Sequence, residues 1–357
     1  MNNQSKLYLD VHVLQTVPPS CINRDDTGSP KTAVYGGVTR ARVSSQAWKR
    51  AVRLMFREML SQELVGLRTK RAVELVTAQL KAQGVEEGCE KLAAKALENA
   101  GIKVNKASQT DALLFLSPAQ AKELARLAIV GETDKQYYKN AIQEYPSVDM
   151  ALFGRMVASD PALNYDAAAQ VAHSISTHEV RNEYDYFTAV DDCSPDDNMG
   201  AGHLGTVEFY SATLYRYATV NVQELVQHLK TDAPEAAKNF VKAFLLSMPT
   251  GKQNTFANRT APDLAYVTLR NDQPVNLAGA FERPVQSNGE GYIGVSVRAL
   301  GHYALRTYQS FVAPPEQAFC VGAAEGAEAL APSVGIQELL DAVQNAVADY
   351  CKAEEEK

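Results

Sequence analysis

Residues 6–14 alternate strictly between two sets of side chains, a pattern that an extended strand presents on two opposite faces. One set is aliphatic and the other is mostly polar or aromatic: Leu7, Leu9, Val11 and Val13 against Tyr8, Asp10, His12 and Leu14. We therefore predict a half-buried strand here. A second extended signal lies in residues 184–220, where two segments flank a tip rich in Gly, Asp and Asn, which predicts a long β-hairpin.

Helical patterns and one loop occupy the rest of the chain. We expect a loop over residues 18–37, and then a helix that begins at Ser45 and is capped by Ser44 or Ser45. Residues 60–160 contain Ala-rich amphipathic stretches separated by glycines, which indicate a helical insertion. The remainder predicts helices over 221–230, 234–247, 296–311 and 337–352 and a strand over 265–270. This order favours an α+β fold whose ferredoxin-like core carries two insertions.

Charge is distributed unevenly along the chain. The net charge is −7, yet residues 27–57 contain seven basic residues and no acidic one. The helix predicted from Ser45 has an apolar face formed by Trp48, Val52, Met55, Phe56 and Met59. A second face carries a cationic stripe of Lys49, Arg53 and Arg57, with Arg50 beside them. Exposed helix faces usually mix signs. The stripe therefore favours contact with a nucleic acid, whose binding releases counterions, over a merely solvated face.

The composition limits the remaining classes of protein. A length of 357 residues suggests two to three domains, or one core with large insertions. No apolar run reaches the length of a membrane span and no secretory signal is present, so we expect a cytoplasmic protein. Five scattered cysteines and six histidines show neither a disulfide framework nor metal-ligand spacing. We therefore expect no metal and no cofactor.

Three features resemble functional elements, and each also has a structural explanation. Asp25 and Asp26 suit a metal site or a general base, but an Asx turn and an ion pair with Arg24 explain them better. Residues 250–253 faintly resemble the end of a phosphate-binding loop, but Leu246 takes the place of the first glycine and Gln253 that of the Ser/Thr, although Lys252 can still contact a phosphate. Aromatic residues near the hairpin suit core packing or the stacking of single-stranded bases: Tyr184, Tyr186, Phe187, Tyr210, Tyr215 and Tyr217.

Longer motifs carry a resemblance to a known family. The chain resembles the backbone subunit of the type I-E CRISPR Cascade complex, the CasC family. The N-terminal motifs are LDVHVL (9–14), PSCINRDD (19–26), YGG (35–37) and RVSSQ (42–46), and the later ones are FGRM (153–156), FTAVDD (187–192), GHLGT (202–206) and YRYA (215–218). The resemblance extends over essentially the whole chain and is weakest between residues 60 and 145.

The resemblance implies a fold and a function. The implied parts are an RRM-like palm, helical fingers and a β-hairpin thumb, with the palm at 1–58, 168–185 and 216–357, the fingers at 59–167 and the thumb at 186–215. The implied protein is not an enzyme. It assembles along the guide RNA (crRNA) in several copies, kinks it at regular intervals and presents it to target DNA in antiviral defence. The implied partners are crRNA, target DNA, further copies of itself, other Cascade subunits and a recruited helicase-nuclease, with no membrane.

The matching positions imply residue roles. Contacts to the RNA backbone fall to Arg24, Lys31, Ser44, Gln46, Lys49, Arg50 and Arg53. Met156 is implied to wedge against bases near the kink, and Phe187 and Thr188 to pack beside the displaced nucleotide. Tyr186, where the family can have Trp, and His203, in the second hairpin strand, complete the RNA contacts. Lys135 and Lys139 are implied to contact target DNA without sequence preference.

One alternative function belongs to a different class. Some relatives in RNA-targeting CRISPR complexes cut RNA with an aspartate in a loop, and Asp25 or Asp26 is the residue that would serve here. The alternative is thus a metal-dependent RNA endonuclease. It would require the carboxylates to be available to a metal ion, whereas the structural explanation uses them within their own loop.

Overall fold

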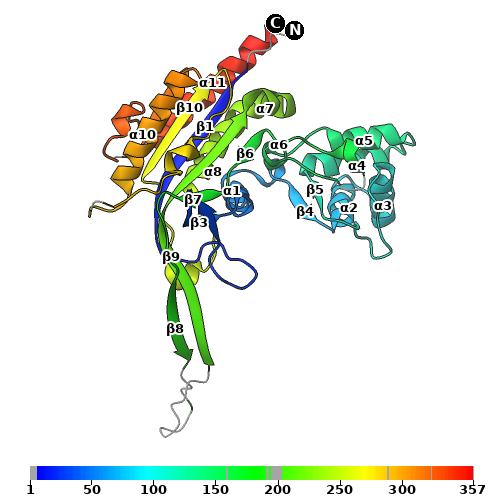
Figure 1. Ribbon diagram of the computed structural model, residues 1–357. Helices are drawn as coiled ribbons and strands as arrows, with labels where there is room; N and C mark the ends of the chain where they lie inside the picture. The colour runs from blue at the N-terminus through cyan, green and yellow to red at the C-terminus, as the bar shows by residue number, and fades with distance from the viewer. Residues whose placement is uncertain are drawn as a thin grey trace.

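The computed structural model describes residues 6–157, 160–189, 193, 203–287, 289–322 and 324–356, except for the side chain of His203. It contains a large sheet with helices on both faces, a helical region to one side and a projecting pair of strands (Figure 1). The expected mixed α+β class is confirmed, and its strands pair antiparallel. Across these residues, every helix is too short or too polar to cross a membrane.

The large sheet is built around β1 (Tyr8–Ser20), which pairs with β10 (Leu264–Arg270) on one side and β9 (His203–Asn221) on the other. The strand order is β11-β10-β1-β9-β7-β3-β2, and β6 and β8 also pair with β9. The remaining strands are β2 (Thr32–Tyr35), β3 (Val38–Val43), β6 (Ala169–Val171), β7 (Ser174–Ser176), β8 (Glu183–Ala189) and β11 (Gln317–Val321). Neighbours in this sheet come from distant parts of the chain.

Of two expectations for the N-terminal segment, one is wrong and the other is correct only in part. The first strand is buried on both faces rather than on one, because helices cover both sides of the sheet. The segment expected as a loop over 18–37 is a loop only at 21–31 and 36–37, since β1 continues to Ser20 and β2 (Thr32–Tyr35) lies within it. The pairing of β1 with β9 shifts between Val17 and Ser20. Pro18 and Pro19 occupy this irregularity, where the missing N–H donors disturb the ladder least.

Helices complete the layers on the two faces of the sheet. On one face α1 (Ser45–Met59), α8 (Ala233–Leu246) and α11 (Ile336–Glu355) share a core with β1. On the other face α10 (Ile293–Ser310) covers the tyrosines of β9 and β10. Shorter helices are α7 (Val222–Leu229), α9 (Gln253–Phe256) and the 3-10 turns Gln62–Leu64, Pro161–Leu163, Lys230–Asp232, Leu277–Phe281 and Ala327–Ala329. The four helices expected after residue 220 are thus confirmed.

A helical region follows α1 and has a hydrophobic core of its own. It contains α2 (Ala72–Ala82), α3 (Cys89–Asn99), α4 (Pro118–Ile129) and α5 (Lys135–Gln143), whereas α6 (Val148–Phe153) leads back to the sheet and packs in the core shared by β1, α1 and α8. The expected Ala-rich helices therefore form. A small two-stranded sheet of β4 (Leu67–Thr69) and β5 (Leu114–Leu116) was not expected. In Figure 1 this region extends sideways from the large sheet.

The projecting arm is a continuation of the central sheet (Figure 1). Residues 203–209 of β9 pair with β8, and from Tyr210 onward β9 pairs with β1. One continuous strand therefore carries the arm away from the sheet. The hairpin expected over 184–220 is confirmed for this part, and most of its expected tip, residues 194–202, lies outside the described residues.

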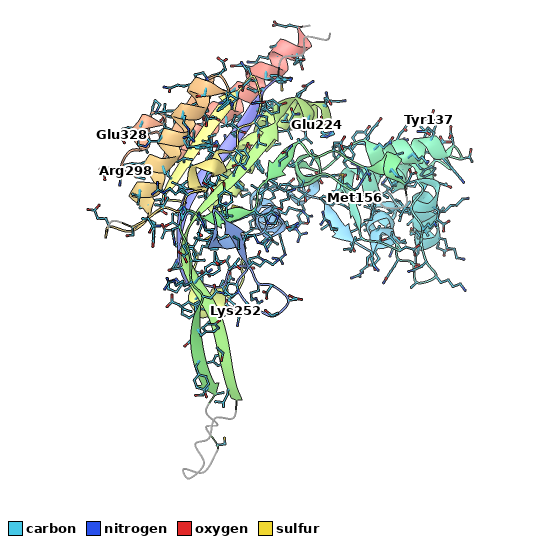
Figure 2. All side chains as sticks on the ribbon, viewed as in Figure 1. Tyr137, Met156, Glu224, Lys252, Arg298 and Glu328 are labelled. Atoms are coloured by element: carbon cyan, nitrogen blue, oxygen red, sulfur yellow. The ribbon has the colours of Figure 1, made fainter. Side chains whose placement is uncertain are left out.

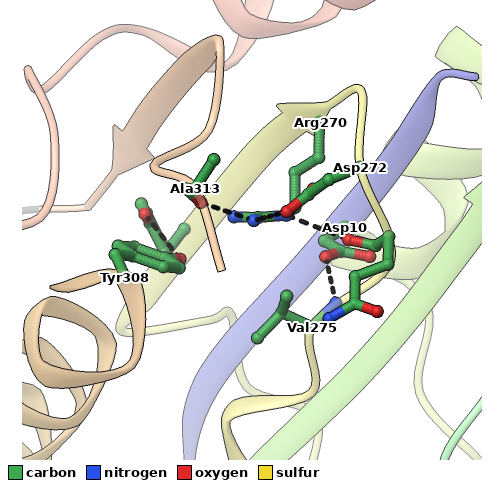
Figure 3. Close-up of polar contacts among 8 residues, drawn as sticks. Asp10, Arg270, Asp272, Val275, Tyr308 and Ala313 are labelled. Carbon is green, nitrogen blue, oxygen red and sulfur yellow. Dashed lines mark hydrogen bonds and ion pairs between the residues drawn. The ribbon is translucent and has the colours of Figure 1, made fainter. Parts of the chain in front are cut away.

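A polar cluster is buried between the sheet and α10 (Figure 3). Asp10 on β1 accepts hydrogen bonds from the Tyr217 hydroxyl at 2.9 Å and the Val275 N–H at 2.8 Å. Arg270 on β10 pairs with Asp272 at 2.8 Å. Burial raises the pKa of Asp10 to about 6, although these donors and the Arg270 charge oppose the shift.

This cluster makes stability depend on pH. Because the pKa of folded Asp10 exceeds its unfolded value, the folded state binds more protons between about pH 4 and pH 6. Stability from Asp10 is therefore complete below pH 4 and is lost as the pH rises through 6. Relative to Asp10→Asn, the free energy of unfolding should fall by roughly 2 kcal/mol from pH 4 to pH 7. Urea titrations of both proteins across this range measure the difference.

The comparison with Asp10→Asn is needed because a neighbouring group acts in the opposite direction. Burial lowers the pKa of His12 to about 3, so its unfolded form gains a proton first as the pH falls. That contribution is present in both proteins and cancels in their difference. A difference that stays constant from pH 4 to pH 7 would contradict the assignment to Asp10.

Candidate nucleic-acid interface

A groove of about 790 Å³ lies beside the N-terminus of α1. Three segments that are distant in sequence line it: residues 22–28, residues 44–54 of α1 and its cap, and residues 248–252. The Ser44 hydroxyl caps α1 by accepting a hydrogen bond from the Ala47 N–H, and the Asn23 side chain accepts one from the Ser44 N–H at 2.9 Å. Asn23 thereby ties the first segment to the start of the helix.

Close backbone packing brings the third segment into the groove. A Cβ atom at Gly251 would lie 2.0 Å from the carbonyl oxygen of Ile22, so only glycine permits this approach. The next residue, Lys252, consequently lines the groove although it lies 193 residues after Met59, the last residue of α1. Figure 2 places Lys252 near the base of the projecting arm. The sequence pointed to Lys252 only through an incomplete phosphate-binding motif.

Three cations converge on the groove: Arg24, Arg50 and Lys252. None of them forms an ion pair with another described residue. The N-terminus of α1 adds the positive end of a helix dipole. Gln46 is exposed beside them and supplies a neutral hydrogen-bonding group. The groove can therefore hold an anionic backbone by charge and by hydrogen bonds.

The carboxylates of Asp25 and Asp26 also line the groove, and that of Asp25 accepts hydrogen bonds from its own loop. Asp25 accepts hydrogen bonds from the Thr27 N–H at 2.9 Å, the Thr27 hydroxyl at 2.7 Å and the Ser29 N–H at 3.0 Å. The Thr27 hydroxyl lowers the pKa of Asp25. The expected Asx turn is therefore present, whereas the expected ion pair with Arg24 is absent from the described residues. Within these residues no three His, Cys, Asp or Glu side chains gather as a metal site would require.

The other cations of residues 27–57 do not line the groove. Arg40 is fully buried and donates to the carbonyls of Ser176 and Phe281, both at 2.8 Å. The Lys49 ammonium lies 5.7 Å from the centre of the Phe153 ring, and burial lowers the pKa of Lys49. The remaining members are half-buried or exposed: Lys31 just before β2, Arg42 on β3, and Arg53 and Arg57 on α1. The cationic segment therefore does not present one continuous surface.

The motif FGRM divides its residues between the interior and the surface. Arg155 is buried and donates to the carbonyls of Leu163 and Ile142 at 2.8 and 3.0 Å. Met156, the next residue, is 83% exposed. Figure 2 shows Met156 on the side of the helical region that faces the large sheet. An exposed thioether beside an anchored arginine is available to contact a ligand.

The projecting arm separates the predicted aromatic contacts between two faces. Side chains alternate along β8, so Tyr186 and Thr188 share one face and Phe187 lies on the other. Phe187 pairs with Gly205 on β9, where a Cβ atom would lie 2.3 Å from the ring. Glycine therefore creates the space for this ring. The fourth predicted contact on the arm, the side chain of His203, lies outside the described residues.

The six aromatic residues noted in the sequence do not form one cluster. Tyr184 and Tyr186 are exposed on the arm, at 69% and 63%. Tyr210, Tyr215 and Tyr217 are buried in the sheet, where Tyr215 hydrogen-bonds His12 at 2.8 Å. Core packing therefore explains the tyrosines of β9, whereas the aromatic residues of β8 are available at the surface.

The two predicted DNA contacts lie on α5 in the helical region. Lys135 is exposed in the first turn of α5, and Lys139 pairs with Asp160 at 3.3 Å. Neither lines the groove at the start of α1. Any ligand that touches both α5 and the groove must therefore extend across the molecule.

The fold and the groove define a mixed α+β protein with a cationic groove and an extended strand arm. The chain belongs to the CT1975-like protein family, whose model matches residues 9–346. It is similar to a solved chain of "CRISPR RNA-guided surveillance complex, pre-nicking", with 34% identity, a TM-score of 0.77, and coverage of 95% of this chain and 100% of that one. A chain of "CRISPR RNA-guided surveillance complex" is 31% identical, with a TM-score of 0.65 and coverage of 95% and 99%. No curated protein matches the chain.

Proposed function

We propose that this chain is the crRNA-binding backbone subunit of a CRISPR RNA-guided surveillance complex of subtype I-E. The observation that carries the proposal is the groove at the start of α1, where Arg24, Arg50 and Lys252 converge with a helix N-terminus. Two similar chains come from CRISPR RNA-guided surveillance complexes and are covered over nearly their whole length. Together, the groove and the similarity support a guide RNA as the polyanion.

In this proposal the parts of the chain act as a hand. The large sheet with α1 is the palm (1–58, 168–185 and 216–357), the helical region is the fingers (59–167) and the arm is the thumb (186–215). The palm holds RNA phosphates with Arg24, Lys49, Arg50 and Lys252, assisted by Ser44, Gln46 and Lys31. Positively charged side chains position the backbone, and the sequence is read by base pairing with the target.

The arm and the FGRM loop would set the kink in the guide RNA. Phe187 on one face of the arm is the side chain that would pack beside a displaced nucleotide, and exposed Met156 would wedge against the neighbouring bases. Tyr186 and Thr188 lie on the opposite face, so they would contact a different nucleotide or a neighbouring copy. His203 stays among the proposed contacts. Lys135 and Lys139 on α5 would touch target DNA.

The proposal assigns no catalysis to this subunit and leaves target degradation to a recruited helicase-nuclease. The alternative, a metal-dependent RNA endonuclease, needs Asp25 or Asp26 as a metal ligand. Asp25 already accepts three hydrogen bonds within its loop, which favours its structural role. The groove remains suited to binding by charge rather than to metal-assisted chemistry.

RNA-dependent assembly tests the proposal. The purified chain mixed with crRNA should form particles that contain several copies at regular spacing, and raising the salt concentration should dissociate them. Sedimentation velocity measures the number of copies, and negative-stain electron microscopy shows the spacing. Absence of RNA binding at low salt would overturn the proposal. Cleavage of a complementary RNA that requires a divalent metal and is abolished by Asp26→Asn would establish the alternative instead.

A further inference from the structure

Arg53 lies one helical turn after Lys49 on α1, but its side chain is directed away from the groove. Its Nε atom donates to the Asp149 carboxylate at 2.8 Å, and Nη2 donates to the carbonyl of Gly66 at 3.3 Å. The Arg53 side chain is only 16% exposed, and that of Asp149 is fully buried. Arg53 does not line the groove that contains Arg24, Arg50 and Lys252.

The partners of Arg53 belong to the two connections of the helical region. Gly66 lies in the connection that leaves α1, and Asp149 lies in α6, where the chain returns to the sheet. The Gly66 N–H donates to the second carboxylate oxygen of Asp149 at 2.8 Å, and the Ser147 hydroxyl donates to the same oxygen at 2.7 Å. A single carboxylate therefore joins both connections, and Arg53 ties that carboxylate to α1.

An aromatic ring of the helical region completes this joint. The Arg53 guanidinium lies 4.6 Å from the centre of the Phe115 ring on β5, and the Arg68 guanidinium lies 5.2 Å from the same ring. A planar guanidinium can stack on a ring while it donates two directed hydrogen bonds, which an ammonium group cannot do. The joint is therefore built for arginine in particular.

We propose that Arg53 is a positioning residue that fixes the helical region relative to the groove, rather than a ligand of RNA phosphate. Its hydrogen bonds hold together α1 and both connections of the region that carries Lys135 and Lys139. The orientation of these lysines relative to the groove consequently depends on the pair of Arg53 and Asp149. The RNA measurement below rests on the proposed function, whereas the distance measurement does not.

Arg53→Lys tests the joint because it keeps the charge and removes the directed contacts. Spin labels at Lys91→Cys on α3 and Glu338→Cys on α11, in a Cys193→Ser/Cys351→Ser background, report the separation of the helical region and the sheet. With Arg53, we expect one narrow distance distribution by double electron–electron resonance. Arg53→Lys and Asp149→Asn should each broaden it at least twofold, and combining them should broaden it no further. The matched control is Arg57→Lys, one turn later on the same helix.

Guide RNA binding separates the two roles. Arg53→Gln should leave the slope of log affinity against log salt unchanged, whereas Arg50→Gln should reduce it by about 0.7 per bound copy. A reduced slope for Arg53→Gln, or an unchanged distance distribution for both Arg53→Lys and Asp149→Asn, would overturn the proposal. Circular dichroism verifies that each variant is folded. If the unmodified chain fails to bind guide RNA, the proposed function fails, while the distance measurement still decides the role of Arg53.

Discussion

Replacing Arg50 and Lys252 together with glutamine should weaken the binding of guide RNA roughly 100-fold. Each residue is expected to contribute one charged contact worth about 1.5 kcal/mol, and the two contributions add to about 3 kcal/mol. The slope of log affinity against log salt should also decrease by about 1.4, because single-stranded nucleic acid releases about 0.7 counterions per neutralised phosphate. Fluorescence anisotropy of labelled crRNA over a salt series measures both quantities.

The matched control for this variant removes the same types of charge elsewhere. Arg298→Gln with Lys352→Gln changes α10 and α11, which do not line the groove. Affinity and slope should be nearly unchanged in this control. Equal losses in both variants would mean that net charge, and not the groove, governs binding, which contradicts the site. Either double variant should remain as stable as the parent, because exposed charges contribute little to folding.

Trp48→Ala should lower the free energy of unfolding by about 3–5 kcal/mol. Trp48 is fully buried on α1, donates its indole N–H to the Ser174 hydroxyl at 2.9 Å, and lies 3.8 Å from the buried Arg216 guanidinium. The substitution removes a large side chain and the ring on which Arg216 stacks. Because Trp48 is the sole tryptophan, unfolding in urea should be followed by circular dichroism.

Trp48→Phe separates packing from hydrogen bonding at the same position. It retains an aromatic ring and loses the contact with Ser174, so we expect a loss of about 1–2 kcal/mol. Trp48→Ala should also weaken the binding of guide RNA, because Trp48 anchors the helix that carries Arg50. A loss below 1 kcal/mol for Trp48→Ala would show that α1 is held mainly by other contacts.

Local patterns predicted most elements of this fold because the responsible interactions act over a few residues. The cap of α1 at Ser44 depends on hydrogen bonds within one turn, and the alternation in residues 8–14 marks a strand in any context. Burial of β1 on its second face was not predictable in this way. It depends on α10, whose sequence lies nearly 300 residues later.

The candidate site was predictable only in part for the same reason. Clustering of charge in residues 27–57 indicated a polyanion, yet Arg40 is buried against carbonyls and Arg53 is paired with Asp149. Lys252 enters the groove because Gly251 packs on the backbone of Ile22. The partners in these contacts are between 96 and 241 residues apart in the chain. Periodicity and motif spacing contain no signal for such distances.

By itself the sequence determined the class of fold, the first helix with its cationic residues, the projecting hairpin and the family resemblance. These follow from side-chain periodicity, capping and charge, which are properties of short segments. Only the tertiary structure decided which cations meet in the groove, which face of the arm carries Phe187, and which arginine joins the helical region to α1. Those choices depend on packing between distant segments, because a charge becomes a ligand or a structural ion pair according to what the fold places beside it.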